Sequence, residues 1–277
     1  MFLTRNRISA MLLFLWFSTA PACKKSNHTN NDFVETDPPV LLRVTMNVHE
    51  QIGGFYLAHP ARYNETSKNY PLIMFIHGGG QYGSGAGDLP RLLTEGIPQL
   101  LKEKKFPSSF ESGGKQYSFI VVVPQFKNFP DNDALSSMLN YVRSAYRIDS
   151  TRIYLTGFSL GGRIVCDYAA AHPEKISAFI ALSGVSSYDI NGKSRIIGEA
   201  RLPAWGFHNR PDQVFRWEDT KDFISGINAS DPNRNSRLTI FEDSTGIQQH
   251  DSWSKATDPK YKENGKNIYE WMLQFKR

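Results

Sequence analysis

The stretch IYLTGFSLGG, residues 153–162, decides the fold. Its first four residues form an apolar run typical of a buried strand, and the next residues carry the pattern G-x-S-x-G, centred on Ser159, before a helical segment. A strained turn at this junction lifts the serine hydroxyl above the sheet edge, and side chains at Gly157 or Gly161 would collide with the neighbouring strand and helix. The bare pattern arises by chance in roughly one chain in ten of this length. Its position between strand and helix therefore favours a nucleophile over a helix N-cap serine.

Other short apolar runs alternate with helical patterns along the chain. Residues 40–48 and 54–58 predict an opening strand pair. The later runs cover residues 72–76, 119–123, 153–156, 178–182, 204–207 and 238–241. The clearest helical patterns, with apolar residues three and four positions apart, cover residues 135–146 and 268–275. This alternation predicts an α/β fold with a mostly parallel sheet, crossover helices on both faces and an antiparallel N-terminal hairpin.

Nucleophilic attack by Ser159 requires a base. A serine hydroxyl is barely nucleophilic at neutral pH, so an imidazole must remove its proton and an acid must hold the tautomer of that imidazole. Ligand sites of open α/β sheets lie at the carboxyl ends of the strands, and His250 follows the last predicted strand. We therefore predict His250 as the base. Structural roles are expected for His28, His49, His59, His172 and His208.

Asp212 is the predicted acid. It follows the run 204–207 by a few residues and lies between Ser159 and His250, which gives the chain order Ser, acid, His. The alternative is a turn aspartate, because Pro-Asp is a common turn pair. Asp243 and Asp231 are the fallback acids.

Backbone N–H groups are the predicted binding site for the oxyanion of the tetrahedral intermediate. Leu160, directly after the nucleophile, supplies the first. The second is expected from the HGGG segment at 77–80, with Gly79 favoured and Gly80 close behind. A phosphate-binding loop would need a following Lys-Ser/Thr, which the sequence lacks. No metal-ligand spacing is present either, so no cofactor is expected.

Together these segments resemble the α/β-hydrolase serine esterases. Within them the chain is similar to the exported group that includes polyhydroxybutyrate depolymerase-like, feruloyl and acetylxylan esterase-like, and prolyl-oligopeptidase-like proteins. The matching segments are FIHGGG (75–80), VVVPQ (121–125), GFSLGG (157–162), WGFHNRPD (205–212) and HDSWSK (250–255). The resemblance implies triad roles for Ser159, Asp212 and His250, and oxyanion roles for Gly79 and Leu160. Asn209 stands where the group more often has glycine.

The predicted substrates are carboxylic esters, cleaved through an acyl-enzyme intermediate. Only about twenty residues separate the strands near 183 and 203, too few for a large cap, and an open cleft favours soluble or polymeric esters such as acetyl or feruloyl esters of polysaccharides. Tyr82, Phe158 and Trp253 are predicted to line the acyl site, with core packing as the alternative. The other candidate functions are a serine peptidase of the prolyl-oligopeptidase type and a non-catalytic glycan-binding lipoprotein.

Residues 1–22 have the features of a signal peptide, with Arg5 and Arg7 before a short apolar segment. Small residues before Cys23 resemble a bacterial lipobox, although Ala20 stands where leucine is expected. We therefore predict an exported cell-envelope lipoprotein, anchored to the membrane through Cys23. The alternative is a secreted or periplasmic protein cut near Ala22. Residues 23–39 are predicted to be a flexible tether, and residues 40–277 a single catalytic domain.

The overall composition is that of a globular protein. With 40% hydrophobic and 21% charged residues, the chain does not fit the collagen-like, disordered or multi-span membrane classes. The formal net charge of +5 is too diffuse to indicate nucleic acid binding. Two cysteines, Cys23 and Cys166, are too few for a disulfide framework, and Cys166 is expected to be a buried thiol.

Overall fold

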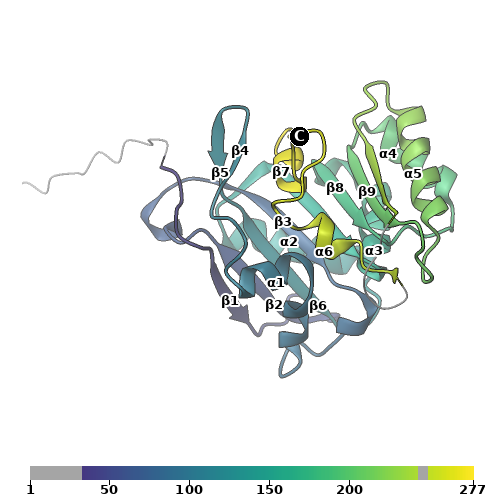
Figure 1. The fold of residues 1–277 in the computed structure, drawn as a ribbon. Helices are drawn as coiled ribbons and strands as arrows, with labels where there is room; N and C mark the ends of the chain where they lie inside the picture. The colour runs from purple at the N-terminus through teal and green to yellow at the C-terminus, as the bar shows by residue number, and fades with distance from the viewer. Residues whose placement is uncertain (1–32, 243–248) are drawn as a thin grey trace, which may run out of the picture. The chain divides into compact units, whose positions relative to one another are not determined.

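A computed structural model describes residues 33–242 and 249–277 of the chain (Figure 1). The predicted signal peptide, the lipidation site Cys23 and the fallback acid Asp243 lie outside the described residues. The described end of the predicted tether contacts the domain, because Lys68 donates a hydrogen bond to the Phe33 carbonyl and the Arg62 guanidinium lies over the Phe33 ring.

The described residues form one eight-stranded sheet in the order β1-β2-β6-β3-β7-β8-β9-β10. The strands are β1 (Val40–Val44), β2 (Ile52–His59), β3 (Tyr70–Ile76), β6 (Ile120–Phe126), β7 (Ile148–Phe158), β8 (Ala178–Leu182), β9 (Ala204–Asn209) and β10 (Arg237–Phe241). β2 pairs antiparallel with both β1 and β6, and the other neighbours pair in parallel. The predicted mostly parallel sheet with an antiparallel opening hairpin is confirmed.

Helices cover both faces of this sheet. They are α1 (Gly96–Lys102), α2 (Asn132–Ala145), α3 (Leu160–Ala171), α4 (Ile190–Glu199), α5 (Trp217–Ser230), α6 (Trp253–Ala256) and α7 (Ile268–Met272). Both predicted helical patterns form helices, α2 and α7. A small hairpin of β4 (Phe110–Ser112) and β5 (Lys115–Tyr117) was not predicted, because its residues show no apolar alternation.

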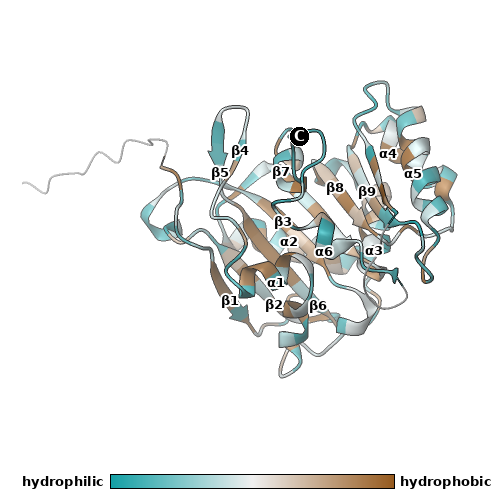
Figure 2. Ribbon diagram, viewed as in Figure 1, coloured by the Kyte–Doolittle hydropathy of each residue, from teal (hydrophilic) through white to brown (hydrophobic). Residues whose placement is uncertain are grey.

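The alternation of side chains along β3 separates two hydrophobic cores. Leu72, Met74 and Ile76 belong to one core, together with apolar residues of α2, α3 and α5. Ile73 and Phe75 belong to the other, together with residues of α1 and α7. Successive side chains of a strand point to opposite faces, so the two cores lie on opposite faces of the sheet. The central strands are accordingly largely apolar in Figure 2.

Two further expectations from the sequence concern α3 and α4. Cys166 on α3 is buried, as predicted, and burial raises the pKa of its thiol. In the described residues the segment between β8 and β9 contains one helix, α4, which packs against α5 at one end of the sheet (Figure 1) and forms no large cap.

None of the described helices is long and apolar enough to cross a membrane.

The start of α3 approaches the end of β3 without intervening side chains. A Cβ atom on Gly161 would lie 2.2 Å from the carbonyl oxygen of Ile76, far inside van der Waals contact. On the other side, a Cβ on Gly162 would lie 3.1 Å from the Cα of Gly184. The turn between β7 and α3 is therefore held against the backbone of its neighbours.

We predict that Gly161→Ala destabilises the protein by about 2 kcal/mol or more, because the added methyl group overlaps main-chain atoms that cannot move without displacing β3. Denaturant unfolding of the variant and the wild type measures the difference. Gly87→Ala is the matched control, since no atom lies within 4 Å of a Cβ at that exposed position. Equal stability of the two variants would contradict the close packing.

Candidate active site

The turn that carries Ser159 is strained. Its φ of 54° and ψ of −124° lie in a region that residues with a side chain rarely adopt. The N–H of Ser159 donates to the Leu182 carbonyl at 2.8 Å, which fixes the turn to β8. The Ser159 side chain makes no capping hydrogen bond to α3. The N-cap alternative therefore has no support, and the hydroxyl lines a pocket instead.

Asp212 and His250 form a close pair at the carboxyl ends of β9 and β10. The Nδ1 atom of His250 lies 2.7 Å from Oδ2 of Asp212. Oδ1 of Asp212 accepts hydrogen bonds from the N–H groups of Val214, at 2.8 Å, and Phe215, at 3.1 Å. Because the carboxylate accepts the proton on Nδ1, the other ring nitrogen of His250 is left as a proton acceptor.

A second histidine bonds the same carboxylate. The Nε2 atom of His208 lies 3.0 Å from Oδ2 of Asp212 and 3.1 Å from the carbonyl oxygen of Phe215. A carbonyl oxygen only accepts, so Nε2 of His208 carries the proton and donates. Its Nδ1 pairs with the Thr220 hydroxyl at 2.7 Å. We expected His208 to be structural, but the structure places it on the predicted acid.

The buried carboxyl of Asp212 remains ionised. Burial alone would raise its pKa, but the hydrogen bonds from His208 and His250, together with those from Val214 and Phe215, outweigh burial and hold the pKa well below its usual range. His208 is the last residue but one of β9 and stands four residues before Asp212, and that spacing was the available signal for its role.

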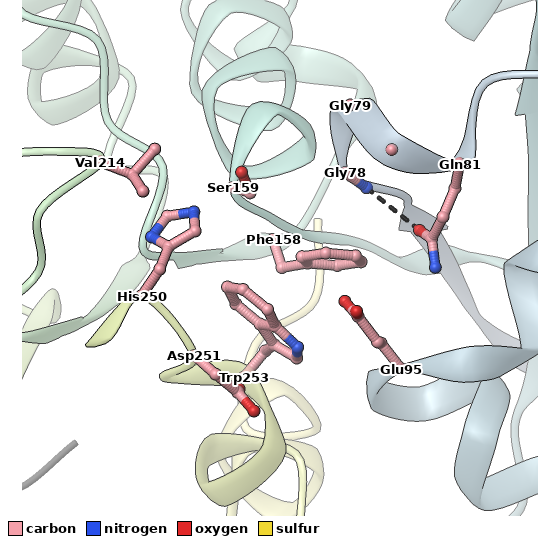
Figure 3. A pocket seen from close by; sticks show the side chains of 11 residues that line it. Gly78, Gly79, Gln81, Glu95, Phe158, Ser159, Val214, His250, Asp251 and Trp253 are labelled. Carbon is pink, nitrogen blue, oxygen red and sulfur yellow. Dashed lines mark hydrogen bonds between the residues drawn. The ribbon is translucent and has the colours of Figure 1, made fainter. Parts of the chain in front are cut away.

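His250 is held between two aromatic rings. The Phe215 ring stacks on it with centroids 5.8 Å apart, and Trp253 meets it edge-on at 5.1 Å. Its Nε2 atom is buried and makes no hydrogen bond with Ser159 or with any other described residue. Figure 3 shows the imidazole facing the Ser159 hydroxyl across the pocket, and both residues line that pocket. In ligand-free enzymes such a contact is often open and tightens when substrate binds.

Gly79 and Gly80 begin a tight turn, η2 (Gly79–Gln81), which two residues separate from the end of β3. A Cβ on Gly79 would lie 3.5 Å from the Leu160 side chain, so the two predicted oxyanion donors lie on adjacent segments. Gly79 is the first residue of η2 and Leu160 is the first residue of α3. The first N–H groups of a helix have no partner within that helix. Gln81 braces this loop by accepting a hydrogen bond from the Gly78 N–H at 3.3 Å.

The pocket has a volume of about 380 Å³. Phe158 and Trp253 line it as a contacting pair, with ring centroids 4.5 Å apart. Tyr82, predicted to line the acyl site, is not among the lining residues, and its ring packs edge-on against His77. Glu95, which sequence reasoning did not single out, also lines the pocket. The complete lining is Gly78, Gly79, Gly80, Gln81, Glu95, Phe158, Ser159, Val214, His250, Asp251 and Trp253.

The remaining candidates lie away from this pocket. Asp231 is buried and accepts hydrogen bonds from the N–H groups of Asn233 and Asn235 in its own turn. His28 lies outside the described residues, and His49, His59 and His172 are not among the pocket residues. In the described part of the chain, no three His, Cys, Asp or Glu side chains gather as ligands for a metal.

The comparison with known families agrees with this geometry. A family model described as the alpha/beta hydrolase fold matches residues 67–252, which include the strand, the turn at Ser159 and the loop of His250. The chain belongs to the α/β-hydrolase fold family. The family resemblance predicted from the sequence is confirmed.

Three curated relatives of this hydrolase carry esterase names. A bifunctional acetylxylan esterase/xylanase of Neocallimastix patriciarum is 24% identical over 149 residues, covering 50% of this chain and 22% of that protein. Acetylxylan esterase A of Aspergillus ficuum is 27% identical over 139 residues, 48% of this chain and 43% of that protein. Feruloyl esterase B of Neurospora crassa is 33% identical over 88 residues, covering 26% of this chain and 30% of that protein. The matches therefore span less than half the length of these relatives.

Solved structures show the same fold. A thermostable esterase superimposes with a TM-score of 0.62 at 20% identity, covering 87% of this chain and 63% of that one. A ferulic acid esterase superimposes with a TM-score of 0.54 at 13% identity, covering 80% of this chain and 95% of that one. At these identities the likeness concerns the fold.

His77 connects β6 to the loop at 77–80, which carries the predicted oxyanion donor Gly79. The N–H of Phe126 donates to its Nε2 at 3.1 Å, so Nδ1 carries the proton and donates to the Gly78 carbonyl at 2.7 Å. Burial lowers the pKa of His77 from its ordinary value of 6.5 to about 4, against the opposing effect of the Gly78 bond. His77 is therefore neutral near pH 7 and joins β6 to the loop.

We predict that His77 makes the folded hydrolase less stable in acid. Between pH 6.5 and 4 the unfolded chain takes up a proton that the folded chain excludes, so stability is fully present above about 6.5 and falls as the pH drops toward 4. The loss is about 3 kcal/mol. Unfolding free energies measured across this range should fall less steeply in His77→Gln, which does not titrate. An unchanged slope in the variant would count against a buried neutral His77.

We predict that His208 positions Asp212. His208→Leu removes one of the two side-chain donors to Oδ2 and should lower kcat by about tenfold, since a hydrogen bond to a charged group contributes about 1.5–3 kcal/mol. His208→Gln keeps an N–H donor and should retain more activity than the leucine variant. Thermal unfolding of both variants separates stability from turnover. If the glutamine variant loses as much activity as the leucine variant at equal stability, the donor role is wrong.

Proposed function

We propose that this protein is a serine hydrolase that cleaves carboxylic esters through an acyl-enzyme at Ser159. The observation that carries the proposal is the state of His250. Its Nδ1 is bound to the ionised Asp212, and its free Nε2 faces the pocket that also holds the Ser159 hydroxyl. A base in the correct tautomer beside a strained serine is the arrangement that acyl transfer requires.

The proposed reaction has two halves. Nε2 of His250 takes the proton of Ser159 as Oγ attacks the ester carbonyl, and the N–H groups of Gly79 and Leu160 bind the resulting oxyanion. The imidazolium then returns its proton to the leaving alcohol, and the carbon–oxygen bond of the ester breaks. Water, activated by the same imidazole, attacks the acyl-enzyme and releases the acid. Asp212 keeps its charge throughout and stabilises the imidazolium.

Ester hydrolysis is supported by the family and by the relatives, which are named as acetylxylan and feruloyl esterases. We propose acetyl or feruloyl esters of polysaccharides as the substrate class. No described feature favours the alternative of a prolyl-oligopeptidase-type peptidase. The assembled Ser159, His250 and Asp212 argue against a non-catalytic glycan-binding role.

Export is proposed from the sequence alone. Residues 1–22 would direct secretion, and lipidation of Cys23 would anchor the hydrolase to the bacterial cell envelope through the tether at 23–39. A soluble secreted or periplasmic enzyme is the alternative. Either location gives the catalytic domain access to extracellular or periplasmic esters.

We predict that Ser159→Ala lowers kcat for a short activated ester, such as 4-nitrophenyl acetate, by at least about a thousandfold, because no nucleophile remains to form the acyl-enzyme. Ser144→Ala is the matched control, since Ser144 is exposed on α2 and absent from the pocket. Ester turnover that survives the Ser159 change would refute the mechanism. Faster turnover of a peptide amide than of the matching ester would refute the ester assignment.

A further inference from the structure

Glu95 places a carboxylate in the pocket of Ser159, and that carboxylate has no partner among the described residues. Glu95 stands at the N-cap position of α1, yet its side chain makes no capping hydrogen bond. The charges that act on it are those of Asp251 and His250, and no described Lys or Arg pairs with it. The oxygens of Glu95 are therefore available to a bound molecule.

The pocket is negatively charged. Glu95 and Asp251 are its two acidic residues, and no Lys or Arg is among the lining residues. Asp251 accepts hydrogen bonds from the Ser254 N–H at 2.8 Å and from its hydroxyl at 2.6 Å, but these neutral donors leave the charge uncompensated. Burial raises the pKa of Glu95, the charge of Asp251 raises it further, and His250 lowers it. A positively charged ligand would balance the two carboxylates.

The rest of the lining offers little surface for recognition by apolar contact. Phe158 and Trp253 are only 4% and 7% exposed, because they pack into the core. The oxyanion side of the pocket is the glycine run 78–80. The other unpartnered polar group is Nε2 of His250, whose side chain is 10% exposed. Charge is therefore the property by which this pocket can discriminate among ligands.

The positions of Glu95 and His250 indicate which part of an ester meets the free carboxylate. In the proposed mechanism His250 returns the proton to the leaving alcohol, so the alcohol lies on the His250 side of Ser159. Figure 3 shows Glu95 on the other side of Ser159, beyond the rings of Phe158 and Trp253. The acyl part of a bound ester therefore extends toward Glu95.

We propose that Glu95 makes the acyl site selective for acyl groups that carry a positive charge, such as those of ω-amino acids and their quaternary ammonium derivatives. The inference rests on the proposed ester hydrolysis at Ser159 and adds a substrate class to the neutral acetyl and feruloyl esters. A cationic group pairs with Glu95 and favours its ionised form, in a site where no Lys or Arg competes. A neutral acyl group leaves the carboxylate to water, and an anionic one meets a like charge.

The test compares ethyl esters that differ in charge but not in shape. Ethyl 4-(trimethylammonio)butanoate and ethyl 5,5-dimethylhexanoate are isosteres, because a quaternary nitrogen in one replaces a quaternary carbon in the other. The wild type should prefer the cationic ester by about tenfold in kcat/KM, as expected for a charge pair at a half-buried site. A second pair, longer by two methylene groups, allows for reach, and the preference should appear in at least one pair. Added salt should reduce it by screening.

Glu95→Gln should bring the ratio of the isosteres close to one, because it removes the charge and keeps the shape of the side chain. The monoethyl ester of hexanedioic acid, which carries a carboxylate, should be a poor substrate of the wild type. It should be a better substrate of Glu95→Gln, a gain that misfolding cannot produce. Glu103→Gln is the matched control, because it removes the same charge from the exposed end of α1, outside the pocket. Its ratios should equal those of the wild type.

A wild type that hydrolyses 4-nitrophenyl acetate but does not prefer the cationic ester in either pair would overturn the assignment of Glu95. An unchanged preference in Glu95→Gln would overturn it as well. Choline acetate and 3,3-dimethylbutyl acetate carry the same contrast on the alcohol. A preference confined to this alcohol pair would overturn the assignment of Glu95 to the acyl side. Failure of the wild type to hydrolyse any of these esters, 4-nitrophenyl acetate included, would instead overturn the proposed function.

Discussion

The close approach between the turn at Ser159 and the end of β3 is the contact on which the rest of the site depends. The backbone of Gly161 lies so near the Ile76 carbonyl that no side chain fits between them. From the other side the Leu182 carbonyl holds the N–H of Ser159, so the positive-φ backbone is clamped between β3 and β8. The loop at 77–80, which carries the predicted oxyanion donor Gly79, continues directly from Ile76. One contact between main chains therefore sets the predicted nucleophile and the loop at 77–80 relative to each other, and strain at Ser159 is the cost of that arrangement.

A buried charge is the second constraint. The side chain of Asp212 has no exposure to solvent, and an ionised carboxylate there is stable only if its oxygens are hydrogen-bonded. Two backbone N–H groups and the side chains of His208 and His250 supply those bonds. The same bonds hold the Asp212 carboxylate in one orientation. In that orientation its Oδ2 accepts from Nδ1 of His250, so the imidazole carries its proton on Nδ1. The need to satisfy a charge thus determines the geometry of His250, the predicted base, while apolar packing by Phe215 and Trp253 holds its ring.

Much of the fold follows from apolar periodicity. The opening pair and the six later runs correspond to the eight strands of the sheet. Inner strands such as β3 and β6 are buried on both faces and leave continuous apolar segments in the sequence, whereas β1 at the sheet edge is largely exposed. The order of those strands does not follow from periodicity, since pairing is a relation between segments distant along the chain. The antiparallel pairing of β2 with β6 and the polar hairpin of β4 and β5 became visible only in the structure.

Chain order predicts the pocket residues that directly follow strand ends. It misses pocket residues that come from other segments of the chain. Tyr82 comes soon after the loop at 77–80, but its ring packs onto His77 instead of entering the pocket. Asp251 is the neighbour of His250 in sequence, yet Ser254 already occupies its carboxylate. Glu95 comes from a remote segment, and its oxygens have no partner among the described residues. Adjacency along the chain therefore says less about a side chain's availability to a ligand than the hydrogen bonds it already makes.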